Sequence, residues 1–161
     1  MRRRLHAYVF ILLLAVIASI EASAQLKLVA FESLDSLQKM EKRPVVVFVH
    51  TNWCVYCGAM KNSTFKKKDV VQALNDKFYF VSLDAEDRRT VHFNGHEFMF
   101  KPKGINSGVH ELAEQLGTVD GMLGYPVVCF LNPRFEITYQ HPGYLSPKEF
   151  LKLLKQIANN S

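Results

Sequence analysis

Two cysteines, Cys54 and Cys57, have the residue type and spacing best suited to chemistry in this chain. They follow an apolar run at residues 44–49 and open a stretch that is compatible with a helix. A cysteine at the start of a helix lies among unpaired backbone N–H groups at the positive end of the helix dipole, so its thiolate is favoured over its thiol. This placement predicts that Cys54 is a nucleophile.

Cys57 follows three residues later and returns to the same face of the expected helix. It is therefore close enough to attack a mixed disulfide formed at Cys54, and the spacing predicts a two-step thiol–disulfide exchange. A structural pair or a metal site is the alternative. A zinc site needs four ligands, and the nearest third candidate is His50, which is more typical of packing, hydrogen bonding or tuning of the dithiol. Gly58 in place of histidine excludes a c-type haem, and we expect neither a metal nor a cofactor.

Residues 1–24 have the pattern of a signal peptide. Three consecutive arginines precede an uncharged core of 13 residues at 8–20, and Ala22-Ser23-Ala24 fits the small-residue rule for cleavage. The core is shorter than the roughly 20 residues that a membrane-spanning helix needs. We therefore expect cleavage after Ala24 and one exported domain, residues 25–161, in the periplasm or secreted.

Charge and cysteine content limit the functions open to this domain. Removing residues 1–24, with three arginines and one glutamate, lowers the net charge from +5 to +3, which is too mild to indicate nucleic-acid binding. Three cysteines are too few for a disulfide framework in a small exported domain. The third, Cys129, lies in an apolar run and is predicted to be a buried, inert thiol.

Short apolar strands alternate with amphipathic helices along the domain. The valine-rich run at residues 45–49 is apolar on both faces, which predicts a central strand covered by helices on both sides. The order of the elements predicts an α/β domain with a mixed sheet. Further strands are expected at residues 78–83, 127–131 and 136–140, and helices after N-caps at Ser33, Asp69, Ser107 and Ser146.

An inserted β-hairpin is predicted at residues 90–100, before the penultimate helix. Two alternating runs meet at Asn94-Gly95, and a two-residue turn there pairs Phe93 with His96 and His92 with Glu97. The two histidines then lie on opposite faces, which argues against a shared metal ion. The apolar face either covers the domain or contacts a partner, and it carries Val91, Phe93, Phe98 and Phe100.

These features resemble the thioredoxin-fold superfamily over most of residues 25–161. The run Trp53-Cys54-Val55-Tyr56-Cys57 after an apolar strand is similar to its redox signature, and Tyr125-Pro126 stands where the family has its cis-proline. Together with residues 63–65 and 70–74, the motif is similar to periplasmic thioredoxin-like domains of the DsbD group, which pass electrons to disulfide-containing proteins. The resemblance implies a central mixed sheet flanked by helices.

The resemblance also implies a role for each site residue. Cys54 would be the attacking thiol and Cys57 the resolving thiol of a redox-active disulfide, with Trp53 shielding the site and Tyr125-Pro126 positioning the substrate. Tyr56, between the cysteines, stays accessible if both sulfurs react and is expected to contact the substrate. The expected partners are protein disulfides and an upstream electron donor, such as a membrane thiol carrier in a periplasm, and the protein is expected to be a monomer.

One position departs from the family pattern. Many thioredoxins bury an acidic residue six positions before the first cysteine, where it helps to move the proton of the resolving thiol, and this chain has Phe48 there. Either water or another group handles that proton, or the exchange is slower. We expect a reductase or an isomerase-like electron carrier. The alternative is a binding module whose dithiol holds a partner protein or a soft metal such as Cu(I).

Overall fold

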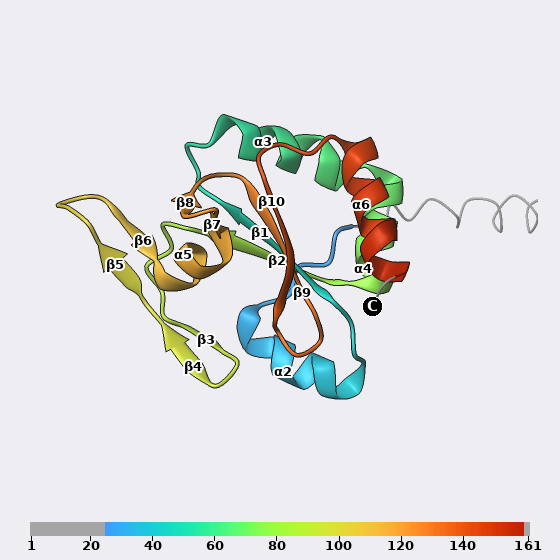
Figure 1. The fold of residues 1–161 in the computed structure, drawn as a ribbon, viewed down its shortest axis with the longest axis horizontal. Coiled ribbons are helices and arrows are strands. Elements are labelled where there is room, and N and C mark those ends of the chain that lie inside the picture. Colours follow the sequence, from blue (N-terminus) through green and yellow to red (C-terminus); the bar gives the residue numbers. More distant parts are fainter. Residues whose placement is uncertain (1–24, 160–161) are drawn as a thin grey trace, which may run out of the picture.

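A four-stranded mixed sheet forms the centre of the fold (Figure 1). The structure, a computed structural model, describes residues 25–159, so the predicted signal peptide at residues 1–24 lies outside the described residues. The strand order is β10-β9-β1-β2, and only β1 and β2 are parallel. The strands are β1 (Val45–His50), β2 (Tyr79–Asp84), β9 (Val127–Leu131) and β10 (Ile137–Pro142).

Helices cover both faces of the sheet, as the sequence predicts. All six residues of β1 are buried, and alternate side chains enter two apolar clusters because successive residues of a strand point to opposite faces. Val45, Val47 and Val49 pack toward α2 (Phe31–Met40) and α5 (Glu111–Gly117). Val46 and Phe48 pack toward α3 (Val55–Asn62), η1 (Thr64–Lys66), α4 (Lys68–Lys77) and α6 (Pro147–Asn159). None of the described helices is long and apolar enough to span a membrane.

Three of the four predicted helix caps are wrong. Helix α2 begins after Ala30 and α4 after Lys67, each without a side-chain cap, so neither Ser33 nor Asp69 caps a helix. Ser107 precedes a strand, and α5 is capped instead by the buried ring of His110, whose Nδ1 accepts the N–H of Leu112 at 3.2 Å. The Ser146 capping box is confirmed, because the backbone N–H of Ser146 donates to Glu149 Oε2 at 3.0 Å.

The segment between β2 and α5 forms two antiparallel strand pairs. The predicted hairpin is confirmed in its register, and Asn94 and Gly95 both have positive φ, as a type I′ turn requires. A second pair was not predicted, and Figure 1 shows it extending away from the central sheet as an arm. The hairpin is β3 (Val91–Phe93) with β4 (His96–Phe98), and the arm is β5 (Phe100–Pro102) with β6 (Gly108–His110).

The apolar face of the hairpin divides between these two pairs. Val91 and Phe93 are buried, and the ring of Phe93 lies 5.0 Å from that of Phe31 in α2, so this part covers the domain. Phe100 belongs to the arm, where its ring lies over Gly108 so closely that a Cβ there would come within 2.3 Å. A last small hairpin follows α5, with strands β7 (Thr118–Val119) and β8 (Met122–Leu123).

Candidate active site

Cys54 and Cys57 form a disulfide at the start of α3, directly after the central strand β1. Cys54 is the N-cap of this helix, and its Sγ accepts the backbone N–H of Cys57 at 3.1 Å. The same N–H and the positive end of the helix dipole would stabilise a Cys54 thiolate after reduction. Cys54 is 8% exposed and Cys57 only 1%, so Cys54 is the more accessible of the two cysteines.

An aromatic rim surrounds the disulfide. Trp53 is 66% exposed, and its Nε1–H donates to Glu86 Oε1 at 3.1 Å, which fixes the indole beside the loop after β2. The indole also meets the ring of Tyr125 edge-on, with the ring centroids 5.9 Å apart. Tyr56 is 65% exposed, and its ring centroid lies 6.5 Å from that of Tyr144, a rim residue that sequence reasoning missed.

The structure brings the predicted site residues Trp53 and Tyr125 together beside the dithiol. The Tyr125–Pro126 peptide bond is cis, and Pro126 is buried directly before β9. Its carbonyl accepts the N–H of Gly143 at 2.7 Å, which fixes the segment against the loop after β10. Tyr125 packs against both apolar clusters, and burial raises the pKa of its hydroxyl to about 12, so this hydroxyl is neutral at physiological pH.

Phe48 lies in the same apolar cluster as the two cysteines and is 1% exposed. Its ring lies edge-on to Phe65, with the centroids 4.7 Å apart, and stacks on His50 with the centroids 5.3 Å apart. The position of the acid in many thioredoxins is therefore an apolar wall here. The nearest polar side chain on the neighbouring strand is that of Ser82, which lies opposite Phe48 in the register of β1 and β2.

His50 is a hydrogen-bonded residue of the site and is 5% exposed. Its Nε2 lies 2.9 Å from Ser82 Oγ, and its Nδ1 lies 3.1 Å from the Nζ of Lys61 in α3. Burial, and then the charge of Lys61, lowers the pKa of His50, and burial lowers the pKa of Lys61. Sequence reasoning missed Lys61 and Ser82, although Lys61 follows Cys57 by the four residues that place two side chains on one helix face.

The lowered pKa of His50 predicts a loss of stability in acid. The folded protein holds His50 neutral, whereas in the unfolded chain the pKa of a histidine is about 6.5. At a pH between these two pKa values, the unfolded chain therefore binds more protons than the folded protein. The free energy of unfolding should therefore fall as the pH drops below about 6.5. Urea denaturation from pH 7.5 to 5 measures this slope. The variant His50→Gln should flatten it, whereas His92→Gln, at an exposed histidine, should not; equal slopes in all three proteins would refute the role of His50.

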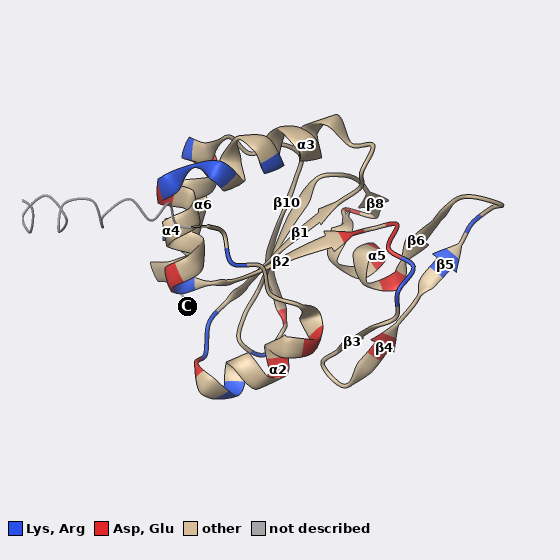
Figure 2. Ribbon diagram, turned by 180° about the vertical axis from the view of Figure 1, so that it is seen from behind, with Lys and Arg blue, Asp and Glu red and all other residues tan. Residues whose placement is uncertain are grey.

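Acidic and basic groups lie at different ends of the site (Figure 2). Asp84 ends β2 and Glu86 lies in the red loop that follows it, and Asp84 Oδ2 accepts from Asn52 at 2.9 Å. The blue segments at the end of α3 and in η1 include Lys61 and Lys66. A polar hollow of about 290 Å³ separates the motif from the arm and is lined by Asn52, Asp84, Glu86, Arg88, Phe100, Asn106 and Gly108.

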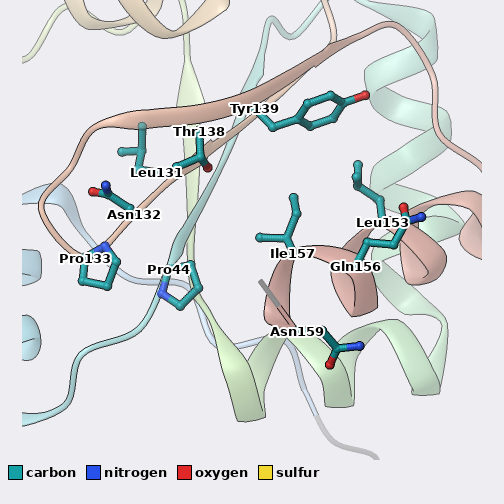
Figure 3. A pocket seen from close by; sticks show the side chains of 10 residues that line it. All are labelled: Pro44, Leu131, Asn132, Pro133, Thr138, Tyr139, Leu153, Gln156, Ile157 and Asn159. Atoms are coloured by element: carbon teal, nitrogen blue, oxygen red, sulfur yellow. The ribbon is translucent and has the colours of Figure 1, made fainter. Parts of the chain in front are cut away.

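Two further features do not belong to the site. Cys129 lies fully buried in β9, where burial raises the pKa of its thiol to about 12, in agreement with the predicted inert thiol. A hollow of about 870 Å³ lies between β10 and α6, and Figure 3 shows the side chains that line it. Pro44, one of them, directly precedes β1, whereas the dithiol follows the other end of that strand. Within residues 25–159, no three His, Cys, Asp or Glu side chains are grouped to hold a metal ion.

Solved structures share this fold. A DsbH oxidoreductase matches with a TM-score of 0.59 at 14% identity, over 87% of this chain and 89% of that chain. A thioredoxin from Thermus thermophilus matches with a TM-score of 0.59 at 23% identity, over 83% and 87%. The C-terminal domain of DsbD from Neisseria meningitidis, in its reduced form, matches with a TM-score of 0.51 at 18% identity, over 78% and 90%.

The sequence comparisons agree with this fold. No curated protein matches the chain in sequence. Residues 31–158, which include the dithiol, the cis-proline and every strand of the central sheet, match the family described as a thioredoxin-like domain. This chain, with a Cys54–Cys57 disulfide at the start of α3, therefore belongs to the thioredoxin-like domain family.

Proposed function

We propose that this protein is an exported thiol–disulfide oxidoreductase that passes electrons to the disulfides of other proteins. The observation that carries the proposal is the different placement of the two sulfurs. Cys54 caps α3 and accepts a backbone N–H, whereas Cys57 lies beneath it and is almost fully buried. One sulfur is thus prepared for attack and the other is kept for the resolving step.

The exchange proceeds in two displacements. The Cys54 thiolate attacks one sulfur of the substrate disulfide, the substrate S–S bond breaks, and the other substrate sulfur leaves as a thiolate. Cys57 then attacks Cys54 Sγ, the mixed disulfide breaks, and the second substrate thiolate leaves. Two electrons have moved to the substrate, and the Cys54–Cys57 disulfide seen in the structure remains.

The aromatic rim is the proposed substrate surface. Trp53 and Tyr56 are exposed on either side of the dithiol and offer apolar faces with polar edges. Tyr125 and Pro126 complete this surface, and we propose that the backbone of the substrate lies against them. The substrates are therefore extended segments of proteins that contain disulfides.

The side chains around Cys54 favour the reducing direction. Val55 and Tyr56, between the cysteines, are uncharged, and Glu86 reaches the site through its hydrogen bond with Trp53. Negative charge near a thiol disfavours the thiolate, which makes the dithiol a weaker oxidant. Oxidised protein then needs an upstream donor, which we propose to be a membrane thiol carrier. The protein would act as a monomer in the periplasm or after secretion, following cleavage near Ala24.

The reduction potential of the Cys54–Cys57 pair tests this direction. We expect a value well below about −200 mV, in the range of reductases and isomerases. Equilibration in dithiol buffers, with the free thiols counted at each point, measures it, and Cys129 adds a constant background because it is buried. A potential near about −120 mV would mark an oxidant and reverse the proposed electron flow. Failure to form a reversible disulfide would refute the enzyme itself.

A further inference from the structure

A polar pair of one buried and one partly buried side chain lies beside Phe48, the residue that stands where many thioredoxins have an acid. The pair consists of His50, at the end of β1, and Lys61, in α3. Lys61 Nζ lies 3.1 Å from His50 Nδ1, and His50 Nε2 lies 2.9 Å from Ser82 Oγ. Side chains from β1, α3 and β2 thus meet in one hydrogen-bonded chain.

A charged Lys61 and a neutral His50 satisfy both hydrogen bonds. An ammonium has only donors, so Lys61 donates to Nδ1, and the proton of the neutral ring lies on Nε2 and is donated to Ser82. The cation is therefore hydrogen-bonded to the protein at the edge of a hollow that is open to solvent. Asp84 of β2 acts on both groups, and Lys66 of η1 lines the same hollow as Lys61 but donates to Asn62 Oδ1 at 3.2 Å.

The position of Lys61 in α3 relates this cation to the resolving thiol. Cys57 and Lys61 are separated by four residues, which places them on adjacent turns of one helix face. Phe48 packs in the cluster that contains Cys57, and its ring also stacks on His50. An apolar wall thus lies beside the thiol and the cation, and a charge acts more strongly in such surroundings than in water.

Resting on the proposed function, we propose that the Lys61 ammonium, held in place by His50, stabilises the thiolate of Cys57 while Cys54 is in a mixed disulfide. In this role Lys61 is a positioning residue that takes the place of the missing acid. The acid of many thioredoxins accepts a proton, whereas a cation favours loss of the proton to water by stabilising the charge that remains.

A hollow of about 860 Å³ brings water to Lys61 and to Ser82, the partner of His50. Its lining includes Phe48, Lys61 and Ser82, together with Gln25, Leu26 and Leu28 before α2, and it is open to solvent. The proton of Cys57 passes to water, the thiolate attacks Cys54 Sγ, and the bond from Cys54 to the substrate sulfur breaks. The substrate sulfur keeps the electron pair and leaves as a thiolate, so no external oxidant or reductant enters this step.

The resolving step can be observed with a chromogenic aryl disulfide, 5,5′-dithiobis(2-nitrobenzoate). Reduced protein should release two aryl thiolates in sequence, the first when Cys54 attacks and the second when Cys57 displaces the aryl group. Stopped-flow absorbance from pH 5 to 10 gives the apparent pKa of each phase. Cys129 does not interfere, because burial raises its pKa to about 12.

The variant Lys61→Met should raise the apparent pKa of the second phase by about one pH unit and leave the first phase unchanged. At pH 7 the second phase should slow about threefold, because the thiolate fraction falls about tenfold while each thiolate becomes about threefold more nucleophilic. Above both pKa values the variant should be at least as fast as wild type. If the substitution damaged the structure instead, the second phase would be slower than in wild type at every pH. Crossing of the rate–pH profiles of wild type and Lys61→Met therefore identifies the electrostatic role.

Two control variants separate charge from position. Lys61→Arg keeps a cation that can donate to His50 and should retain the wild-type profile, and so should Lys66→Met, which removes a lysine from the same hollow. An unchanged second-phase pKa in Lys61→Met would overturn the role of Lys61 but would not contradict the proposed oxidoreductase activity. Release of only one aryl thiolate by wild type would overturn the proposed function instead.

As a second measurement, thiolate absorbance at 240 nm in Cys54→Ser should show the same rise in the pKa of Cys57 when Lys61 is replaced by methionine.

Discussion

Replacing Cys54 with serine should abolish the reduction of protein disulfides. The hydroxyl of serine stays protonated at neutral pH even when it accepts the N–H of residue 57, so no nucleophile is available for the first displacement. Loss of a covalent nucleophile lowers the rate by a factor on the order of 10³ or more. Insulin reduction, followed by the turbidity of the precipitated chains, measures this loss in the presence of a dithiol donor.

Replacing Cys57 with serine should have a different effect, because Cys54 can still attack. The mixed disulfide then has no resolving thiol and accumulates as a covalent complex, visible on a non-reducing gel and lost on reduction. Cys129→Ser is the matched control for removing a cysteine, and it should keep wild-type activity because Cys129 is fully buried in β9. Equal trapping by Cys54→Ser and Cys57→Ser would contradict the assignment of the two roles.

The same experiment separates the enzyme from a binding module. A module that held a partner or Cu(I) through the dithiol would trap no covalent complex above background when Cys57 is replaced. Within residues 25–159 the dithiol has no third side chain grouped with it to hold a metal. His50, the third ligand considered from the sequence, has both ring nitrogens within hydrogen-bond distance of Ser82 and Lys61.

Features with a local signal could be predicted from the sequence. The central strand and the start of α3 follow from a valine-rich run and a dithiol, and the register of the β3–β4 hairpin follows from Asn94-Gly95, whose positive φ values the turn requires. Three helix caps could not be predicted, because serine and aspartate near a helix start are only one way to satisfy its N–H groups. The buried ring of His110 does so for α5.

Features made by distant residues had no such signal. The arm depends on the close approach of Phe100 to Gly108, and Tyr144 reaches the rim from the loop after β10. The pair formed by His50 and Lys61 needs β1, α3 and Ser82 of β2 in contact. The sequence did show the departure at Phe48, but the group that compensates for it became visible only in the fold.

Restoring an acid at position 48 should destabilise this protein. Phe48→Asp removes a ring that is 1% exposed and packs on Phe65 and His50, and truncation of a buried phenylalanine costs about 3–5 kcal/mol. Burial of the new carboxyl adds a penalty, which an ion pair with Lys61 in the adjoining hollow would partly offset. We therefore expect the free energy of unfolding to fall by about 3 kcal/mol or more at pH 7.

Urea denaturation of the oxidised protein measures this change, and Phe48→Leu is the control, because it keeps an apolar side chain and should cost only about 1 kcal/mol. If Phe48→Asp unfolded at the same urea concentration as Phe48→Leu, the wall beside the dithiol would be wet and able to hold a charge. The reason for placing the compensating cation on Lys61 would then be lost, because an acid could work at position 48 as it does in many thioredoxins. A large loss confined to the aspartate variant would mean that the apolar wall beside the disulfide cannot hold a charge at position 48, and that a charged group near the resolving thiol has to come from another element, such as α3.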